Sequence, residues 1–203
     1  RGFMYLVSVN QRYDESRAQA NLELDEAVTN LIRQCVLEAR DNKSCIGYYL
    51  ADEPWFRGLN PEYLGKMYNL LKELDPYRMV MIVDLNPTDY GKVCDVIVPH
   101  SYMNPTQDES GRRRFRSGDP ERYRSYVHEA MNAGLQNRAI WYMPQCFSYA
   151  GEYRDYACRH PNLRETRWFA WEGVINGVGG LAPFISYGYS GHHESRIAID
   201  ATF

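Results

Sequence analysis

Two adjacent carboxylic acids follow directly on an apolar stretch in the first half of the chain. In the segment "IGYYLADEPW", residues 46–55, the apolar side chains end at Asp52 and Glu53. A carboxylate at the end of a buried strand is costly unless it is hydrogen-bonded, paired or used in chemistry. The pair therefore has two interpretations, as acids that solvate a turn or as part of a binding site.

The other apolar stretches also end in side chains that can form hydrogen bonds. Turns favour Asn and Asp, but His, Tyr, Gln and Glu are not typical turn residues. We therefore interpret the residues at these ends as a ring around a pocket. The ring comprises Asn10, Asp52, Glu53, Asp84, Asn86, His100, Tyr102, Gln145, Tyr187 and Tyr189.

Aromatic residues are abundant, with 17 tyrosines and four tryptophans among 203 residues. A flat apolar ring with a polar handle suits sugars, whose C–H faces stack on it while their hydroxyls form hydrogen bonds. Trp55 follows the acidic pair, and Trp141 lies in the same apolar stretch as Gln145. These residues predict a carbohydrate ligand, although most single tyrosines are expected only to pack.

Short apolar stretches alternate with patterns of helical periodicity. The predicted strands are residues 3–10, 45–52, 78–86, 94–102, 139–147 and 180–188. The predicted helices are residues 21–40, a helix beginning at Pro61 with Asn60 as its cap, a helix from Asp119 and Pro120 to Gly134, and a helix from Asn162 to Gly177.

Strands that alternate with helices predict parallel βαβ units, either in an open doubly wound sheet or in a closed barrel. No GxGxxG motif follows the first strand, which favours the barrel. In such a barrel, chemistry occurs at the carboxyl ends of the strands. Side chains alternate along a strand, so Glu53 would share the inward face with Gly47, Tyr49 and Ala51. Asp52 would face the helical layer or cap the next segment.

Several segments together resemble the C-terminal three quarters of a glycoside-hydrolase-like barrel. They are "GYYLADEP", "LNPEYLGKMYNLLKELDPYRMVMIV", "CDVIVPHSY", "AIWYMPQCF" and "LRETRWFAWEGVINGVGGLAPFISYGYSG". The chain is similar to the large retaining clan whose acid/base Glu follows strand four in an Asn-Glu-Pro or Asp-Glu-Pro motif. The resemblance implies an α/β fold of the TIM-type (β/α)8 class, in which residues 1–203 form a single domain with strands three to eight. By this match the first two strands and the last helix are not in this chain, and the missing strands would come from an upstream segment or a second chain.

The resemblance also implies that Glu53 is the general acid/base of a glycoside hydrolase. Gln145 would then occupy the place of the nucleophilic Glu, and an amide cannot form the usual glycosyl ester. Asp84 and Glu152 are the candidates for the second carboxylate that the reaction needs. Glu172, within a predicted helix, is expected to be a packed or solvated acid. The alternative function is a barrel that binds glycans or supports an assembly without catalysis.

Composition narrows the classes of partner. A formal net charge of -3 gives no electrostatic reason to expect nucleic acid, and no apolar stretch is long enough to span a bilayer. The five cysteines show no CxxC spacing, which argues against a structural zinc site. We predict no metal, no cofactor and a disulfide between Cys146 and Cys158, which lie near one predicted loop. If the chain belongs to a glycosidase, an extracellular or secreted location is the candidate.

Overall fold

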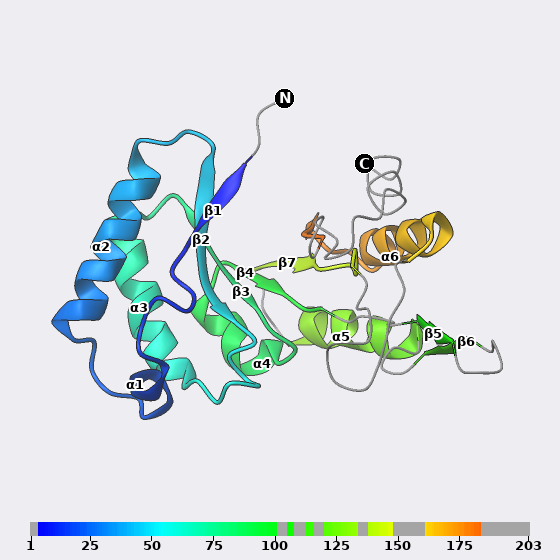
Figure 1. The fold of residues 1–203 in the computed structure, drawn as a ribbon, viewed down its shortest axis with the longest axis horizontal. Coiled ribbons are helices and arrows are strands. Elements are labelled where there is room, and N and C mark those ends of the chain that lie inside the picture. Colours follow the sequence, from blue (N-terminus) through cyan, green and yellow to red (C-terminus); the bar gives the residue numbers. More distant parts are fainter. Residues whose placement is uncertain are drawn as a thin grey trace. The chain divides into compact units, whose positions relative to one another are not determined.

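The computed structural model describes residues 4–100, 105–107, 113–115, 120–133, 138–147 and 161–183. Within them strands and helices alternate, as the sequence predicts, in an α/β fold (Figure 1). The chain divides into two compact units, and each is described by itself. The first comprises Arg1–Val98 with Asn132–Ala139, and the second comprises Pro99–Met131 with Ile140–Phe203.

The first unit contains four parallel strands in the order of the chain. They are β1 (Tyr5–Ser8), β2 (Cys45–Asp52), β3 (Met79–Val83) and β4 (Val96–Val98). The side chains of β4 and most of those of β3 are buried, as expected of parallel strands covered on both faces. The predicted parallel arrangement is confirmed here, and the carboxyl ends of these strands meet at one edge of the sheet.

Two long helices, α2 (Glu26–Arg40) and α3 (Pro61–Leu74), lie side by side against these strands (Figure 1). The predicted cap of α3 is confirmed, because the Asn60 side chain accepts a hydrogen bond from the backbone N–H of Glu62. The predicted start of α2 at residue 21 is wrong. Asn21 has a φ of 51°, which a helix cannot contain, and Asp25 caps the helix at the N–H of Val28.

Shorter helices follow β1 and β3. Helix α1 (Glu15–Gln19) was not predicted, because five residues are too few for a clear helical period. The short connection between β3 and β4 forms α4 (Pro87–Tyr90) and a 3-10 helix, η1 (Gly91–Val93).

Asp95, just before β4, joins several elements at the amino ends of the strands. Its carboxylate accepts hydrogen bonds from Tyr68 Oη at 2.8 Å, Lys72 Nζ at 3.0 Å and the backbone N–H of Val80 at 2.9 Å. Burial by itself raises the pKa of Asp95, but these hydrogen bonds outweigh it and hold the pKa below its ordinary value. Asp95 thus connects α3 to β3 and β4, opposite to the end that carries Glu53.

Gly47 in β2 packs directly on the backbone of β3. A Cβ atom built at this position would lie 2.0 Å from the carbonyl oxygen of Met79, which no side-chain rotation can relieve. We predict that Gly47→Ala lowers the free energy of unfolding by about 2 kcal/mol, since overpacking of this kind forces the strands apart. Urea denaturation measures the change. Gly179→Ala is the control, because its Cβ would meet nothing closer than 3.8 Å, and an equal loss in both variants would contradict the prediction.

The second unit is built from α5 (Pro120–Asn132), β7 (Ala139–Tyr142), α6 (Leu163–Ile175) and β8 (Gly180–Leu181), and β7 pairs with β8 in parallel. Val127, Tyr142 and Phe169 form its buried core. Asn162 caps α6 in a capping box with Glu165, which confirms the predicted start of this helix.

Glu172 on α6 is buried and its carboxylate pairs with Arg124 Nε on α5 at 2.6 Å. It is therefore a packed structural acid, as predicted. Cys146 is buried and is a free thiol in the described part of the chain, and Cys158, its predicted disulfide partner, lies outside the described residues. The antiparallel hairpin of β5 (Pro105–Gln107) and β6 (Arg113–Phe115) was not predicted, because its short, arginine-rich sequence carries no apolar alternation.

No helix among the described residues is long and apolar enough to cross a membrane.

Candidate functional site

The carboxyl ends of β1, β2 and β3 bring five predicted site residues together in the first unit, Asn10, Asp52, Glu53, Trp55 and Asp84. The side-chain oxygen of Asn10, after β1, accepts a hydrogen bond from the backbone N–H of Asp52 at 3.2 Å. The carboxylate of Asp84, after β3, accepts one from the backbone N–H of Trp55 at 2.9 Å. The segment that contains Asp52, Glu53 and Trp55 is therefore held on both sides by the neighbouring strands.

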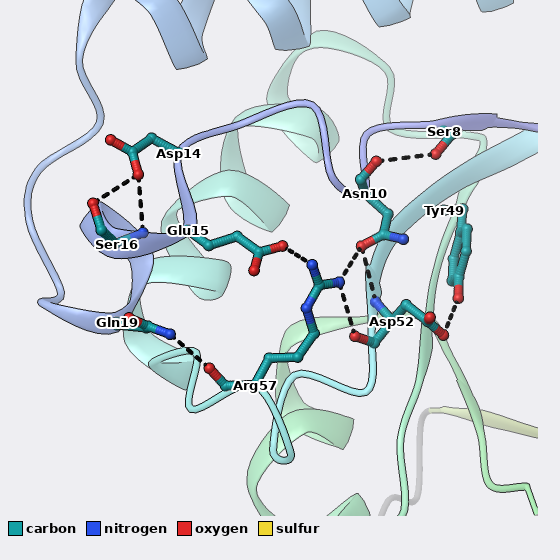
Figure 2. Close-up of polar contacts among 9 residues, drawn as sticks. All are labelled: Ser8, Asn10, Asp14, Glu15, Ser16, Gln19, Tyr49, Asp52 and Arg57. Carbon is teal, nitrogen blue, oxygen red and sulfur yellow. Dashed lines mark hydrogen bonds and ion pairs between the residues drawn. The ribbon is translucent and has the colours of Figure 1, made fainter. Parts of the chain in front are cut away.

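Asp52 faces the opposite way from the sequence prediction. A register irregularity lies between Tyr49 and Ala51 where β2 pairs with β3, so one extra residue of β2 is inserted at that point. Such a bulge reverses the alternation of the residues beyond it, so ideal strand alternation no longer places Glu53 on the inward face, and its direction depends on the turn that follows β2. The Asp52 carboxylate accepts a hydrogen bond from the Tyr49 hydroxyl at 2.5 Å (Figure 2), and it therefore lies on the side of Tyr49 and not toward the helical layer.

Glu53 has an unusual backbone conformation. Its φ is 45°, in the left-handed region that residues other than glycine seldom adopt. Its backbone N–H donates to the carbonyl of Val83 at 2.8 Å, and its own carbonyl accepts from the N–H of Arg57 at 3.0 Å. The side chain is half-buried. Strained backbone of this kind persists only where the surroundings fix it, and it is concentrated at functional sites.

Asp84 supports the segment that bears Glu53. Asp84 is buried, with only 1% of its surface exposed. One carboxylate oxygen accepts from Trp55 N–H and the other accepts from Asn86 N–H at 2.5 Å. These two backbone bonds stabilise the carboxylate in its buried position and give Asp84 a structural role at this edge of the sheet.

Two neighbouring aromatic side chains follow Glu53 and face solvent. Trp55 is 58% exposed and Phe56 is 73% exposed. Exposed rings next to a candidate catalytic carboxylate offer a surface on which a sugar ring can stack. Trp55 was predicted as a binding residue, whereas Phe56 was missed.

Sequence reasoning also missed Arg57 and Glu15, which Figure 2 shows beside Asn10 and Asp52. Arg57 Nη1 donates to Asn10 Oδ1 and to the carbonyl of Asp52, each at 3.4 Å, and Arg57 Nη2 pairs with the Glu15 carboxylate. The only sequence signal was an arginine four residues after Glu53. Glu15 lies 42 positions from Arg57, so no local pattern connects the two.

Three predicted binding residues belong to the second unit. His100 is buried and pairs with Met143 through an isolated parallel bridge. Gln145 is fully buried, and its amide nitrogen donates to the carbonyl of Phe147 at 3.1 Å. Trp141 packs beside Gly180, where an added Cβ would lie 2.8 Å from the indole ring.

Four predicted site residues, Tyr102, Glu152, Tyr187 and Tyr189, lie outside the described residues. Within the described part of the chain, no group of three or more His, Cys, Asp or Glu side chains is arranged to hold a metal ion.

No protein-family model matches the chain, and no curated protein matches it either. Its fold is similar to part of an FMN-binding β-glucuronidase from Facaelibacterium prausnitzii L2-6, with a TM-score of 0.57 and 12% identity over 88% of this chain and 27% of the other. The β-glucuronidase from Ruminococcus gnavus in complex with N1-substituted uronic isofagomine gives a TM-score of 0.52 and 13% identity over 86% of this chain and 35% of the other.

The β-D-glucuronidase of Dictyoglomus thermophilum gives a TM-score of 0.51 and 15% identity over 87% of this chain and 32% of the other. The chain therefore spans between 27% and 35% of the length of these three enzymes. At such low identities the similarity shows the fold alone, an α/β fold shared with part of each of these three structures.

Proposed function

We propose that this chain is part of a glycoside hydrolase in which Glu53 is the general acid/base. The observation that carries the proposal is the position of Glu53 at the carboxyl end of a parallel strand, in a backbone conformation that its neighbours impose. In βα barrels the catalytic groups come from these ends. The fold similarity to three β-glucuronidases supports the same class of reaction.

The first unit would then supply part of an eight-stranded βα barrel, with its polar residues at the mouth. A sugar would stack on Trp55 and Phe56, whose exposed rings lie next to Glu53 in the chain. Asn10 and Asp52 would hold hydroxyl groups or position the acid. A glycoside of a uronic acid is the substrate suggested by the names of the similar structures.

Glycoside hydrolysis needs a second carboxylate, about 5–5.5 Å from the first in retaining enzymes and roughly 6.5–9.5 Å away in inverting ones. Asp84 and Glu152 are the candidates. Both oxygens of Asp84 already accept backbone hydrogen bonds, so we favour Glu152 for this role. Asp84→Asn and Glu152→Gln variants test the choice by their turnover and by the midpoint of their urea denaturation. Loss of the true second carboxylate should abolish turnover and leave the denaturation midpoint unchanged.

The second candidate function is a glycan-binding barrel that has lost catalysis. Gln145 favours it, since the resemblance assigns this residue to the place of the nucleophile. Its amide donates within the protein to Phe147 and cannot form a glycosyl ester. His100, Trp141 and Gln145 would then serve binding alone.

The deciding experiment uses the full-length protein that contains this chain. It is incubated with aryl β-glucuronides, β-galacturonides, β-galactosides and natural oligosaccharides, and release of the aryl group or of sugar is measured. We expect turnover of at least one uronide. Saccharide binding in calorimetry without turnover of any substrate would contradict catalysis and support the binding module.

A further inference from the structure

A guanidinium group lies against the backbone that leads into Glu53 (Figure 2). Arg57 follows Glu53 by four residues and donates hydrogen bonds to the backbone carbonyls of both Asp52 and Glu53. Its backbone N–H donates to the carbonyl of Glu53 at 3.0 Å, and its Nη1 donates to the carbonyl of Asp52 at 3.4 Å. The side chain therefore folds back onto the peptide bond that precedes Glu53.

That peptide bond is held at both of its polar atoms. Its carbonyl, from Asp52, accepts from Arg57, and its N–H, from Glu53, donates to the carbonyl of Val83 in β3 at 2.8 Å. The preceding N–H, of Asp52, is held by Asn10 Oδ1 at 3.2 Å. Because φ of Glu53 is the rotation between this peptide plane and the carbonyl carbon of Glu53, fixing the plane restrains one side of that angle.

The angle matters because φ of Glu53 is 45°, which is unfavourable for a residue with a side chain. An unfavourable backbone angle persists when surrounding contacts over-determine it. Bonds to β1 and β3 restrain one side of the segment, and Arg57 supplies the restraint from within the turn that follows β2. Without Arg57 the carbonyl of Asp52 loses a charged donor, and the turn gains freedom to relax.

The guanidinium is itself fixed in place. Glu15 in α1 forms an ion pair with Nη2, and Gln19 Nε2 donates to the backbone carbonyl of Arg57 at 2.8 Å. The side chains of Arg57 and Glu15 are 23% and 27% exposed, so the pair is partly shielded from water. Glu15 also neutralises the guanidinium, which lets Arg57 donate hydrogen bonds beside the candidate acid without adding net charge there.

We infer that Arg57, held by Glu15, is a positioning residue that sets the backbone angle of Glu53 and thereby aims its carboxyl group. This inference rests on the proposed function for its effect on turnover, but the backbone angle is a property of the fold. The residue acts through Glu53 and is not assigned any contact with a substrate.

The test compares the wild type with Arg57→Gln in the full-length protein, by kinetics and by crystal structure. Glycosides with poor leaving groups require protonation, whereas 2,4-dinitrophenyl glycosides do not. We expect kcat/KM to fall at least about tenfold for the first kind and to change less than about threefold for the second, since misplacement of an acid affects only the steps that use it. In the variant crystal, φ of Glu53 should move to a negative value.

Lys66→Gln is the matched control, because it removes another cation that pairs with a carboxylate in the first unit, Glu23 at 2.8 Å. It should leave both kinetics and the Glu53 angle unchanged. Glu15→Gln is the second variant and should reproduce the effect of Arg57→Gln more weakly. It provides the same readouts if Arg57→Gln does not fold.

The inference is overturned if the Glu53 angle stays positive in the Arg57→Gln or Glu15→Gln crystal. It is also overturned if both kinds of substrate lose activity equally. Failure of the proposed function is a separate result, since it appears as a wild type that hydrolyses none of the substrates. In that case the crystal structures alone decide, and relaxation of φ at Glu53 supports the inference.

Discussion

A Glu53→Gln variant is expected to hydrolyse glycosides with poor leaving groups at least about 100-fold more slowly than the wild type, as measured by kcat/KM. The amide keeps the shape of the side chain and removes the proton that would be transferred to the departing oxygen. The backbone bonds of residue 53 to Val83 and Arg57 are unaffected by this change, so the segment should keep its conformation. The loss would then report chemistry and not folding.

Two comparisons sharpen this expectation. The 2,4-dinitrophenyl glycoside of the same sugar should retain most of its kcat/KM, because that leaving group departs without protonation. Sugar binding measured by calorimetry should persist, since the exposed faces of Trp55 and Phe56 remain. Glu38→Gln, an exposed acid on α2, serves as the control and should behave as the wild type. Equal turnover of poor substrates by Glu53→Gln and the wild type would exclude Glu53 as the catalytic acid.

An Asp95→Ala variant is expected to lose about 3 kcal/mol of unfolding free energy at pH 7. Removal of the carboxylate deprives Tyr68 Oη and the N–H of Val80 of their acceptor and breaks the ion pair with Lys72. Chemical denaturation measures the loss, and Glu23→Ala, which breaks a more exposed ion pair, should change stability by less than about 0.5 kcal/mol. A loss in Asp95→Ala no larger than in this control would contradict the structural role of Asp95.

The effect of Asp95 should depend on pH in a defined direction. The pKa of Asp95 is lowered in the folded protein, because its hydrogen bonds outweigh the effect of burial. A carboxylate whose pKa is lowered on folding stabilises the fold at pH values above its pKa in the unfolded chain, which is about 4. This contribution is lost as the pH falls through the pKa of the folded protein. The gap between the wild type and Asp95→Ala should therefore narrow when unfolding is repeated at about pH 3 and below. A gap that widened in acid would refute this assignment.

The sequence by itself determined the order and type of the main elements. Asn60 with Pro61 and Asn162 mark the starts of α3 and α6, because caps satisfy backbone groups that lie within a few residues of them. The continuous apolar segments at β2 and β3 predicted buried parallel strands, since burial on both faces leaves no polar positions. The sequence also located Glu53 at a strand end and Glu172 in a packed helix, because local patterns are sufficient for both.

Only the tertiary structure decided how the side chains at that strand end are oriented. Alternation along an ideal strand sends Asp52 toward the helices, but the pairing with β3 inserts a bulge after Tyr49 and reverses it. The left-handed conformation of Glu53 likewise depends on Val83, 30 positions away, which no local propensity encodes.

The partners of the acidic residues were also beyond local patterns. Asp84 was predicted as a catalytic candidate, yet the fold brings Trp55 N–H, 29 positions away, onto its carboxylate. Arg57 meets Glu15 only because α1 and the turn after β2 are brought to the same edge of the sheet. Caps and periodicity act over one turn of a helix or along one strand, whereas bulges, buried carboxylates and ion pairs between elements are fixed by contacts that exist only once those elements have packed.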